Sequence, residues 1–261
     1  MQLAGETMLY LQQQLPRSLV DQLIREVLDA YSPSHNALDL ELNGAVKELK
    51  LIAEGVIQEN LRYLSAFLFL VTDTTFETSV SGHGNGWHID GTTKYVSGDC
   101  YNIWIPIYTS SNETGLEVIT HADNLEIYEQ LGNPLLTANV ITKVKSKQLF
   151  NKLTRREDSD LLIIGNDTNI LEISSKDLSI HSILSPSVGD LAIFKQNELH
   201  RGRHSNGVRI QLSIKFVTNH SVVDNAYYVK TAPKMLSKHG RLESHLIKEL
   251  LGFRLNSCTQ L

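Results

Sequence analysis

Hydrophobic residues recur every three or four positions in the N-terminal part of the chain. The first run predicts an amphipathic helix over residues 18–31, with Ser18 as its N-cap. The second predicts a helix over residues 42–61, interrupted only by Gly55. Apolar stripes of this kind form the buried face of a helix that packs on another element. We therefore expect both helices to support a sheet.

From Tyr63 onward the hydrophobic spacing changes to alternation, and β-branched and aromatic residues become common. In the strand predicted at 101–108, Pro106 favours an edge position or a strand end. The most regular alternation, at 209–217, follows a predicted loop that carries His200. Further strands are expected at 63–71, 76–80, 116–119, 161–164 and 189–194, the last with its turn. Short strands without regular helices between them favour an antiparallel sandwich or barrel over a βαβ fold.

The pattern loosens in the second half of the chain. A helical turn or two is expected at 125–131. Residues 123–185 are interpreted as an inserted lid or substrate-binding region within one domain covering 1–261, with a solvated surface as the alternative. A last helix is predicted at 242–251, packed outside the barrel, with Gly252 just past its end.

Composition narrows the class of protein. Hydrophobic residues make up 41% and charged residues 20% of the 261 positions, and the mean hydropathy is −0.15, as expected for a soluble globular protein with a core. The net charge of −5 and the scattered lysines and arginines argue against nucleic acid as a partner.

Cysteine content and the N-terminal sequence bear on the compartment. Cys100 and Cys258 are the only cysteines, so neither a disulfide framework nor a thiolate metal site is expected, and a reducing cytoplasm fits best. The N-terminus lacks a basic segment followed by an apolar run, so we expect no secretory signal. The longest apolar stretch, at 63–71, is too short to span a bilayer, and no membrane association is expected.

Two distant stretches carry residues typical of a metal site. His88 and Asp90 are two positions apart, so on a strand their side chains point to the same face. His200 would complete a set of two imidazoles and one carboxylate, the arrangement of non-haem Fe(II) oxygenases. Arg209 follows nine residues later, with room for a turn and a return strand that aims its guanidinium at an acid beside the metal.

Other residues and other chemistries compete with this interpretation. His204 is the alternative third ligand to His200. Asp99 and Asp123 are interpreted as turn residues. The glycine-rich stretch 81–86 lacks the Gly-Lys-Ser/Thr ending of a nucleotide-binding loop. A zinc hydrolase is disfavoured because no glutamate lies at the usual spacing. The remaining histidines interpreted as surface residues or as neighbours of the ligands are His83, His121 and His181.

Several motifs follow one another in a specific order between residues 63 and 217. They are His88-Ile89-Asp90, Tyr101-Asn102-Ile103-Trp104-Ile105-Pro106-Ile107, Gly115-Leu116-Glu117-Val118-Ile119, Gly189-Asp190-Leu191-Ala192-Ile193-Phe194, His200-Arg201-Gly202 and Arg209. The ordered set resembles the Fe(II)- and 2-oxoglutarate-dependent oxygenases, and within them the phytanoyl-CoA-dioxygenase-like branch. A His-x-Asp pair alone would be a weak signal, whereas the whole set is far more specific.

The resemblance implies a mainly β fold with flanking helices, namely a double-stranded β-helix (jelly roll, cupin-like) buttressed by the N-terminal helices. It implies His88, Asp90 and His200 as Fe(II) ligands, and Arg209 as the partner of the distal carboxylate of 2-oxoglutarate, with O2 as the other cosubstrate. His200 is preferred to His204 because it lies where the family places its ligand.

Further positions carry over from the family with specific consequences. Trp104 and Asn85 are expected to contact 2-oxoglutarate. Gln211 replaces the serine that relatives often have two residues after the arginine, which changes the hydrogen bonding expected at the cosubstrate carboxylate. Asp90 is intact, which favours hydroxylation over halogenation.

We therefore expect a dioxygenase that hydroxylates an unactivated C–H bond of a small-molecule metabolite, such as an amino acid or a natural-product intermediate. The alternative is a non-catalytic jelly-roll module that binds a small ligand, and iron-dependent conversion of 2-oxoglutarate to succinate separates the two. Substrate contacts would come from the N-terminal helices, from 123–185 and from the tail after Asn219. No pattern there identifies the substrate or the oligomeric state.

Overall fold

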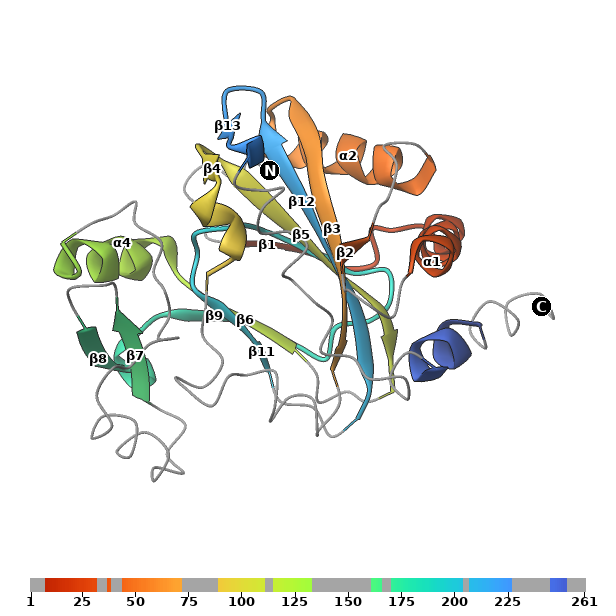
Figure 1. Ribbon diagram of the computed structural model, residues 1–261. Coiled ribbons are helices and arrows are strands. Elements are labelled where there is room, and N and C mark those ends of the chain that lie inside the picture. The colour runs from red at the N-terminus through yellow and green to blue at the C-terminus, as the bar shows by residue number, and fades with distance from the viewer. Residues whose placement is uncertain are drawn as a thin grey trace.

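The computed structural model describes residues 8–31, 37–38, 44–71, 89–110, 115–132, 161–165, 170–203, 207–226 and 245–252. A six-stranded antiparallel sheet forms the centre of this part of the chain, in the order β1-β10-β5-β12-β3-β2 (Figure 1). Its strands are β1 (Met8–Leu11), β2 (Ala37–Leu38), β3 (Leu61–Val71), β5 (Cys100–Thr109), β10 (Leu191–Lys195) and β12 (Arg209–Thr218).

A three-stranded sheet with the order β11-β6-β9 packs against the larger one. It contains β6 (Gly115–Ile119), β9 (Ile180–Leu184) and β11 (His200–Arg203), all antiparallel. The smaller elements are β4 (Val96–Ser97) paired with β13 (Val222–Val223), β7 (Leu161–Gly165) paired with β8 (Ile170–Ser174), and the short 3₁₀ helices η2 (Gly91–Lys94) and η3 (Ser175–Asp177). The expected mainly β jelly roll with flanking helices is confirmed.

The central strand β12 has one apolar and one polar face, because side chains alternate along a strand. Its apolar side chains, Ile210, Leu212, Ile214 and Phe216, belong to the main hydrophobic core. Its polar side chains point to the opposite face, toward the smaller sheet, and are Arg209, Gln211, Ser213 and Lys215. The core therefore lies on one side of the sheet, and polar chemistry is confined to the interior between the sheets.

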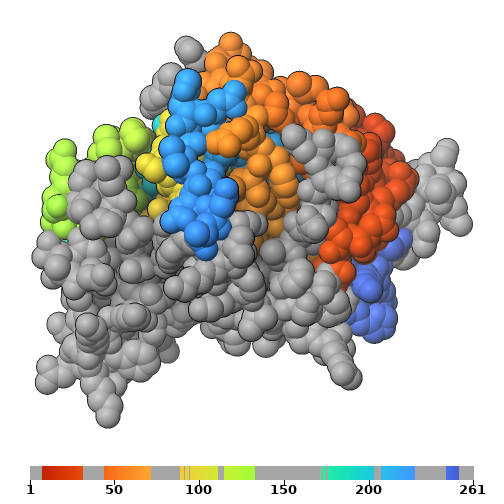
Figure 2. All heavy atoms as spheres, turned by 45° about the horizontal axis from the view of Figure 1, so that its top comes forward, coloured from red at the N-terminus to blue at the C-terminus, as the bar shows by residue number. Residues whose placement is uncertain are grey.

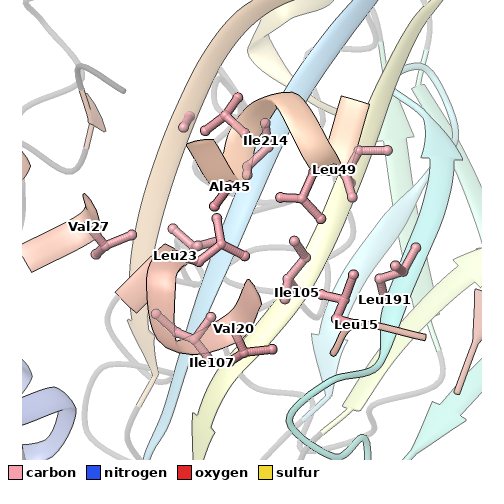
Figure 3. Packing of buried hydrophobic residues seen from close by; sticks show 14 of the residues in the cluster. Leu15, Val20, Leu23, Val27, Ala45, Leu49, Ile105, Ile107, Leu191 and Ile214 are labelled. Carbon is pink, nitrogen blue, oxygen red and sulfur yellow. The ribbon is translucent and has the colours of Figure 1, made fainter. Parts of the chain in front are cut away.

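Helices α1 (Arg17–Ala30) and α2 (Gly44–Ile57) cover the apolar face of the larger sheet. Figure 3 shows Leu23 of α1 and Leu49 of α2 beside Ile105 and Ile214 of the sheet. Both predicted helices are confirmed, although Ser18 lies inside α1 and is not its N-cap. Pro16 takes that position and makes no side-chain capping bond.

The ends of α2 are held by acidic side chains. Glu26 of α1 accepts a hydrogen bond from the backbone N–H of Ala45 (3.0 Å), which satisfies a donor that the helix itself leaves unpaired. Glu54 accepts one from the N–H of Leu61 (2.8 Å), where β3 begins. The helix therefore ends before the predicted limit of residue 61, because Leu61 already belongs to the sheet.

Helical residues 245–252 add to the same core near the C-terminus, where Ile247 and Leu251 are buried in the main cluster. This confirms the expected packing outside the barrel, whereas Gly252 is itself helical instead of following the helix. Figure 2 shows this segment in dark blue beside the red surface of α1. Helix α4 (His121–Gln130) and the β7–β8 hairpin lie at the opposite end of the molecule (Figure 1).

Two expectations about strands are wrong. Pro106 lies in β5, which has β10 on one side and β12 on the other, so it does not mark an edge strand. It is tolerated because the pairing with β10 covers only 101–104, and because the register with β12 shifts beside Pro106. His200 is not in a loop but begins β11, directly opposite Val118 of β6. The predicted strand at 76–80 lies outside the described residues.

Cys100 is a buried free thiol, and Cys258 lies outside the described residues. Among the helices that the structure describes, none has the length and apolarity needed to cross a bilayer.

The buried carboxylate of Asp190 connects the N-terminal strand to the turn before β10. It accepts hydrogen bonds from the Tyr10 hydroxyl (2.5 Å) and from the backbone N–H groups of Gln13 (2.8 Å) and Ser187 (2.7 Å). Burial alone would raise the pKa of Asp190, but these hydrogen bonds outweigh burial and hold the pKa below its ordinary value. Asp190 therefore has a structural role in this turn. The preceding Gly189 has a φ of 105°, a backbone conformation that favours glycine.

We expect Asp190→Asn to lower the free energy of unfolding by about 2 kcal/mol. The asparagine amide has an NH2 group in place of one carboxylate oxygen, and this group cannot accept a hydrogen bond from the Tyr10 hydroxyl or from the backbone N–H groups. A depressed native pKa stabilises the fold above the ordinary aspartate pKa of about 3.9, and this contribution disappears as the pH falls through the native value. The wild-type advantage should therefore be full at neutral pH and shrink below about pH 4. Urea unfolding at several pH values measures it. Asp99→Asn, in a partly exposed pair with Lys195 (2.9 Å), is the control and should change stability little.

Candidate functional site

Asp90 and His200 approach each other between the two sheets. The Asp90 Oδ1 and His200 Nε2 atoms are 3.8 Å apart. That is too long for a hydrogen bond, but two ligand bonds of about 2.1 Å to one ion can span up to about 4.2 Å. The distance between these two atoms is therefore compatible with both of them binding a single metal ion.

His200 is oriented by its own backbone neighbourhood. Its Nδ1 lies 2.8 Å from the carbonyl oxygen of Glu198, and its ring packs 4.8 Å from that of Phe194. An Nδ1–H that donates to this carbonyl places the lone pair on Nε2, the atom that faces Asp90. A metal-binding histidine commonly donates its other ring N–H to a hydrogen-bond acceptor such as a backbone carbonyl.

His88 and Asn85 lie outside the described residues, as does the alternative ligand His204. Within the described residues no group of three potential ligands forms a complete metal site. The role of His88 as third ligand therefore stays a prediction, and so does any contact made by Asn85.

The second oxygen of Asp90 has different partners from the first. Oδ2 forms an ion pair with the Lys215 ammonium and accepts a hydrogen bond from Asn102 Nδ2 (3.3 Å). Asn102 is itself fixed, because the Ser213 hydroxyl donates to its Oδ1 (2.7 Å). The backbone N–H of Asp90 donates to the Gln196 carbonyl (3.1 Å), so the main chain is also tied down at this point.

Arg209 is buried at the other end of the polar face of β12, with 1% of its surface exposed. Its Nη1 donates to the Gly115 carbonyl (2.7 Å), and its guanidinium lies 5.5 Å from the centre of the Trp104 ring. Among the described residues its Nε has no hydrogen-bond partner. Burial lowers the pKa of Arg209 to about 10, so the group stays charged at neutral pH.

A buried guanidinium normally has an anion beside it, because leaving the charge unpaired is costly. No carboxylate among the described residues pairs with Arg209. Its unpartnered Nε and its place between the sheets therefore fit an anionic ligand. Trp104 provides the aromatic surface on which the guanidinium rests, in addition to its place in the hydrophobic interior.

Gly202 of β11 leaves the space that the guanidinium fills. A Cβ at this position would lie 3.0 Å from Arg209 Nη2. A side chain here would therefore press directly on the arginine.

His121 and His181 lie away from this interior. His181 is exposed on β9, whereas His121 Nδ1 lies 2.7 Å from the side-chain Oε1 of Glu198, the residue whose backbone carbonyl holds His200. Burial raises the pKa of Glu198, and its contact with His121 opposes that effect.

Sequence reasoning missed Lys215 and Asn102 as neighbours of Asp90. The signal was present, because Lys215 shares the face of Arg209 within a strand whose other face is apolar from Ile210 to Phe216. A lysine in the middle of a buried strand is uncommon and needs a partner.

Comparisons with known proteins give a match in structure but not in sequence. No protein-family model and no curated protein matches the chain. Among solved structures, the carbocyclase SnoK of nogalamycin biosynthesis, described as non-heme and alpha-ketoglutarate dependent, has a TM-score of 0.52 at 10% identity, over 87% of each chain. The epimerase SnoN in complex with Fe3+, alpha ketoglutarate and nogalamycin RO has a TM-score of 0.51 at 11% identity, over 85% of this chain and 82% of SnoN. At such low identity the similarity shows a shared fold.

We expect Gly202→Ala to destabilise the protein by about 1–3 kcal/mol, because the added methyl group meets a buried guanidinium that cannot easily move. Gly55→Ala is the matched control. A Cβ at Gly55 in α2 meets no described residue within 4 Å, so this change should stabilise the protein by about 0.5–1 kcal/mol. Thermal and urea unfolding measure both, and equal effects of the two substitutions would contradict the close packing at Gly202.

Proposed function

We propose that the protein is a non-haem Fe(II)- and 2-oxoglutarate-dependent dioxygenase that hydroxylates a small-molecule metabolite. The observation that carries this proposal is the buried Arg209, whose Nε has no partner in the part of the chain that the structure describes, in the same interior as the Asp90–His200 pair. A dication and a dicarboxylate would satisfy the two halves of that interior together.

Each half of the interior has its own task in this proposal. Asp90 and His200, with His88 as the predicted third ligand, would hold iron. Arg209 would pair with the distal carboxylate of 2-oxoglutarate, and Trp104 would form a wall of the same pocket. When bound, iron and 2-oxoglutarate together supply the oxidising power that lets O2 break an unactivated C–H bond, with succinate and carbon dioxide as co-products.

The protein's own residues contribute position and exclusion of water. The Glu198 carbonyl fixes the tautomer of His200, so its Nε2 can act as a ligand without first losing a proton. The Gly115 carbonyl holds one Arg209 nitrogen, which limits the guanidinium to one approach direction. Apolar side chains of both sheets, such as Phe194 and Val118, keep the interior dry and strengthen these interactions.

The structural neighbours support the substrate class only in general terms. SnoN is described in complex with nogalamycin RO, and SnoK as a carbocyclase of nogalamycin biosynthesis. We therefore propose a natural-product intermediate or an amino acid as substrate, with residues 123–185 as a lid or substrate-binding region apart from β9 (Ile180–Leu184), which belongs to the three-stranded sheet. The intact carboxylate Asp90 favours hydroxylation over halogenation, whereas an epimerase and a carbocyclase share the same fold.

An anaerobic titration with Fe(II) and 2-oxoglutarate, followed by O2 and a panel of metabolites, tests the proposal. We expect both to bind, and succinate to form only when iron, 2-oxoglutarate and O2 are all present. Binding without succinate across the panel would favour a ligand-binding module. A protein that binds neither would overturn the enzyme proposal, and activity with zinc in the absence of O2 would indicate a hydrolase.

We expect Arg209→Lys to raise the KM for 2-oxoglutarate by about ten- to a hundredfold, because the lysine keeps the charge but loses the planar fork that pairs with a carboxylate. Steady-state succinate release measures this change. Arg201→Lys is the matched control, since Arg201 pairs with Glu117 (2.6 Å). The control should leave this KM within about twofold of the wild type, and an equal rise in both variants would refute the assignment of Arg209.

A further inference from the structure

Lys215 is buried in the middle of β12, with 3% of its side chain exposed. It stands in register with Asn102 of β5 on one side and with Ser65 of β3 on the other. Lysine is rarely buried in this way unless its charge is paired. Its ion-pair partner is Asp90, the carboxylate that faces His200.

The two oxygens of Asp90 are used differently. Oδ2 contacts the Lys215 ammonium and Asn102 Nδ2, whereas Oδ1 faces His200 Nε2 at 3.8 Å. The Ser213 hydroxyl donates to Asn102 Oδ1 and so holds the amide in the orientation that directs Nδ2 at Asp90. A metal ion between Asp90 and His200 would therefore meet one oxygen, while the other is already occupied.

A carboxylate can bind a metal through one oxygen or through both. Two-oxygen binding would use a second coordination position of the ion. The proposed reaction needs open positions for both binding atoms of 2-oxoglutarate and for O2. A side chain that keeps the second carboxylate oxygen away from the metal would therefore leave a coordination position available for 2-oxoglutarate.

We propose that Lys215 is a positioning residue that occupies Oδ2 of Asp90 and so restricts this carboxylate to one-oxygen metal binding. The inference rests on the proposed function, because it concerns the same metal site. The proposal predicts different effects on the affinities for the metal and for 2-oxoglutarate. The ammonium repels a dication, so removing it does not weaken metal binding, but it frees Oδ2 to take a position that 2-oxoglutarate needs. A purely structural ion pair would not separate these two affinities.

The experiment compares Lys215→Met, which keeps the length of the side chain and removes its charge, with wild-type protein. Mn(II) affinity of the metal-free protein is measured from the free-ion signal in electron paramagnetic resonance. The affinity of the Fe(II)-loaded protein for 2-oxoglutarate is measured anaerobically from the visible charge-transfer absorption. We expect Mn(II) affinity to be unchanged or higher, and 2-oxoglutarate affinity to fall by about tenfold or more.

Lys195→Met is the matched control, because Lys195 also pairs with an aspartate, Asp99 at 2.9 Å, in a partly exposed position on β10. It should leave both affinities at the wild-type values. Circular dichroism establishes that each variant is folded. If Lys215→Met does not fold, Lys215→Gln replaces it with a shorter neutral side chain, and the same pair of changes is expected.

Unchanged 2-oxoglutarate affinity in the folded variant would overturn the role of Lys215, and so would a fall in Mn(II) affinity. These results differ from failure of the proposed function, in which the wild-type protein itself would bind neither Mn(II) nor 2-oxoglutarate.

Discussion

The alternation of side chains along β12 is the constraint on which the rest of the structure depends. One face packs on α1 and α2, and the other carries the polar groups between the sheets. A shift of one residue would exchange the faces. The register irregularities beside β12 place the extra residues in its neighbours, Leu64 of β3 and Ile107 of β5. The strand itself stays regular, so Arg209 and Lys215 remain on the same face.

Charges on this inner face are tolerable only if each one finds a partner. Lys215 has Asp90, whereas Arg209 has a backbone carbonyl and an aromatic ring but no carboxylate among the described residues. The difference separates two tasks. The cation with a built-in partner organises the protein, and the cation without one is available to a ligand. The same reasoning explains why Gly202 lies beside the guanidinium, since a Cβ there would lie 3.0 Å from Arg209 Nη2.

Much of the fold could be predicted from sequence because hydrophobic period reports which face of an element is buried. The strand at 209–217 and the helix at 18–31 were therefore predicted nearly to their ends. Period does not report pairing partners, which is why Pro106 was misplaced at an edge and His200 in a loop. The N-cap at Ser18 was wrong because Pro16 takes the N-cap position and the helix begins at Arg17, two residues earlier than the serine suggested.

The candidate site was predictable to the extent that its residues form a recognisable ordered set. Asp90 and His200 do converge, and Arg209 and Trp104 do meet, while His88 and Asn85 lie outside the described residues. Lys215 escaped notice because its importance depends on a contact with a residue far away in sequence. Asp190 could be recognised only as part of a motif, and the three-dimensional structure provides the reason, a carboxylate that holds the N-terminal strand.

A crystal structure with Mn(II) and 2-oxoglutarate, with the metal located by anomalous scattering, tests the central claim most directly. We expect the metal within bonding distance of Asp90 Oδ1 and His200 Nε2, and a carboxylate of 2-oxoglutarate against the Arg209 guanidinium. A metal bound elsewhere, or an Arg209 that contacts no ligand in the occupied protein, would contradict the proposed function.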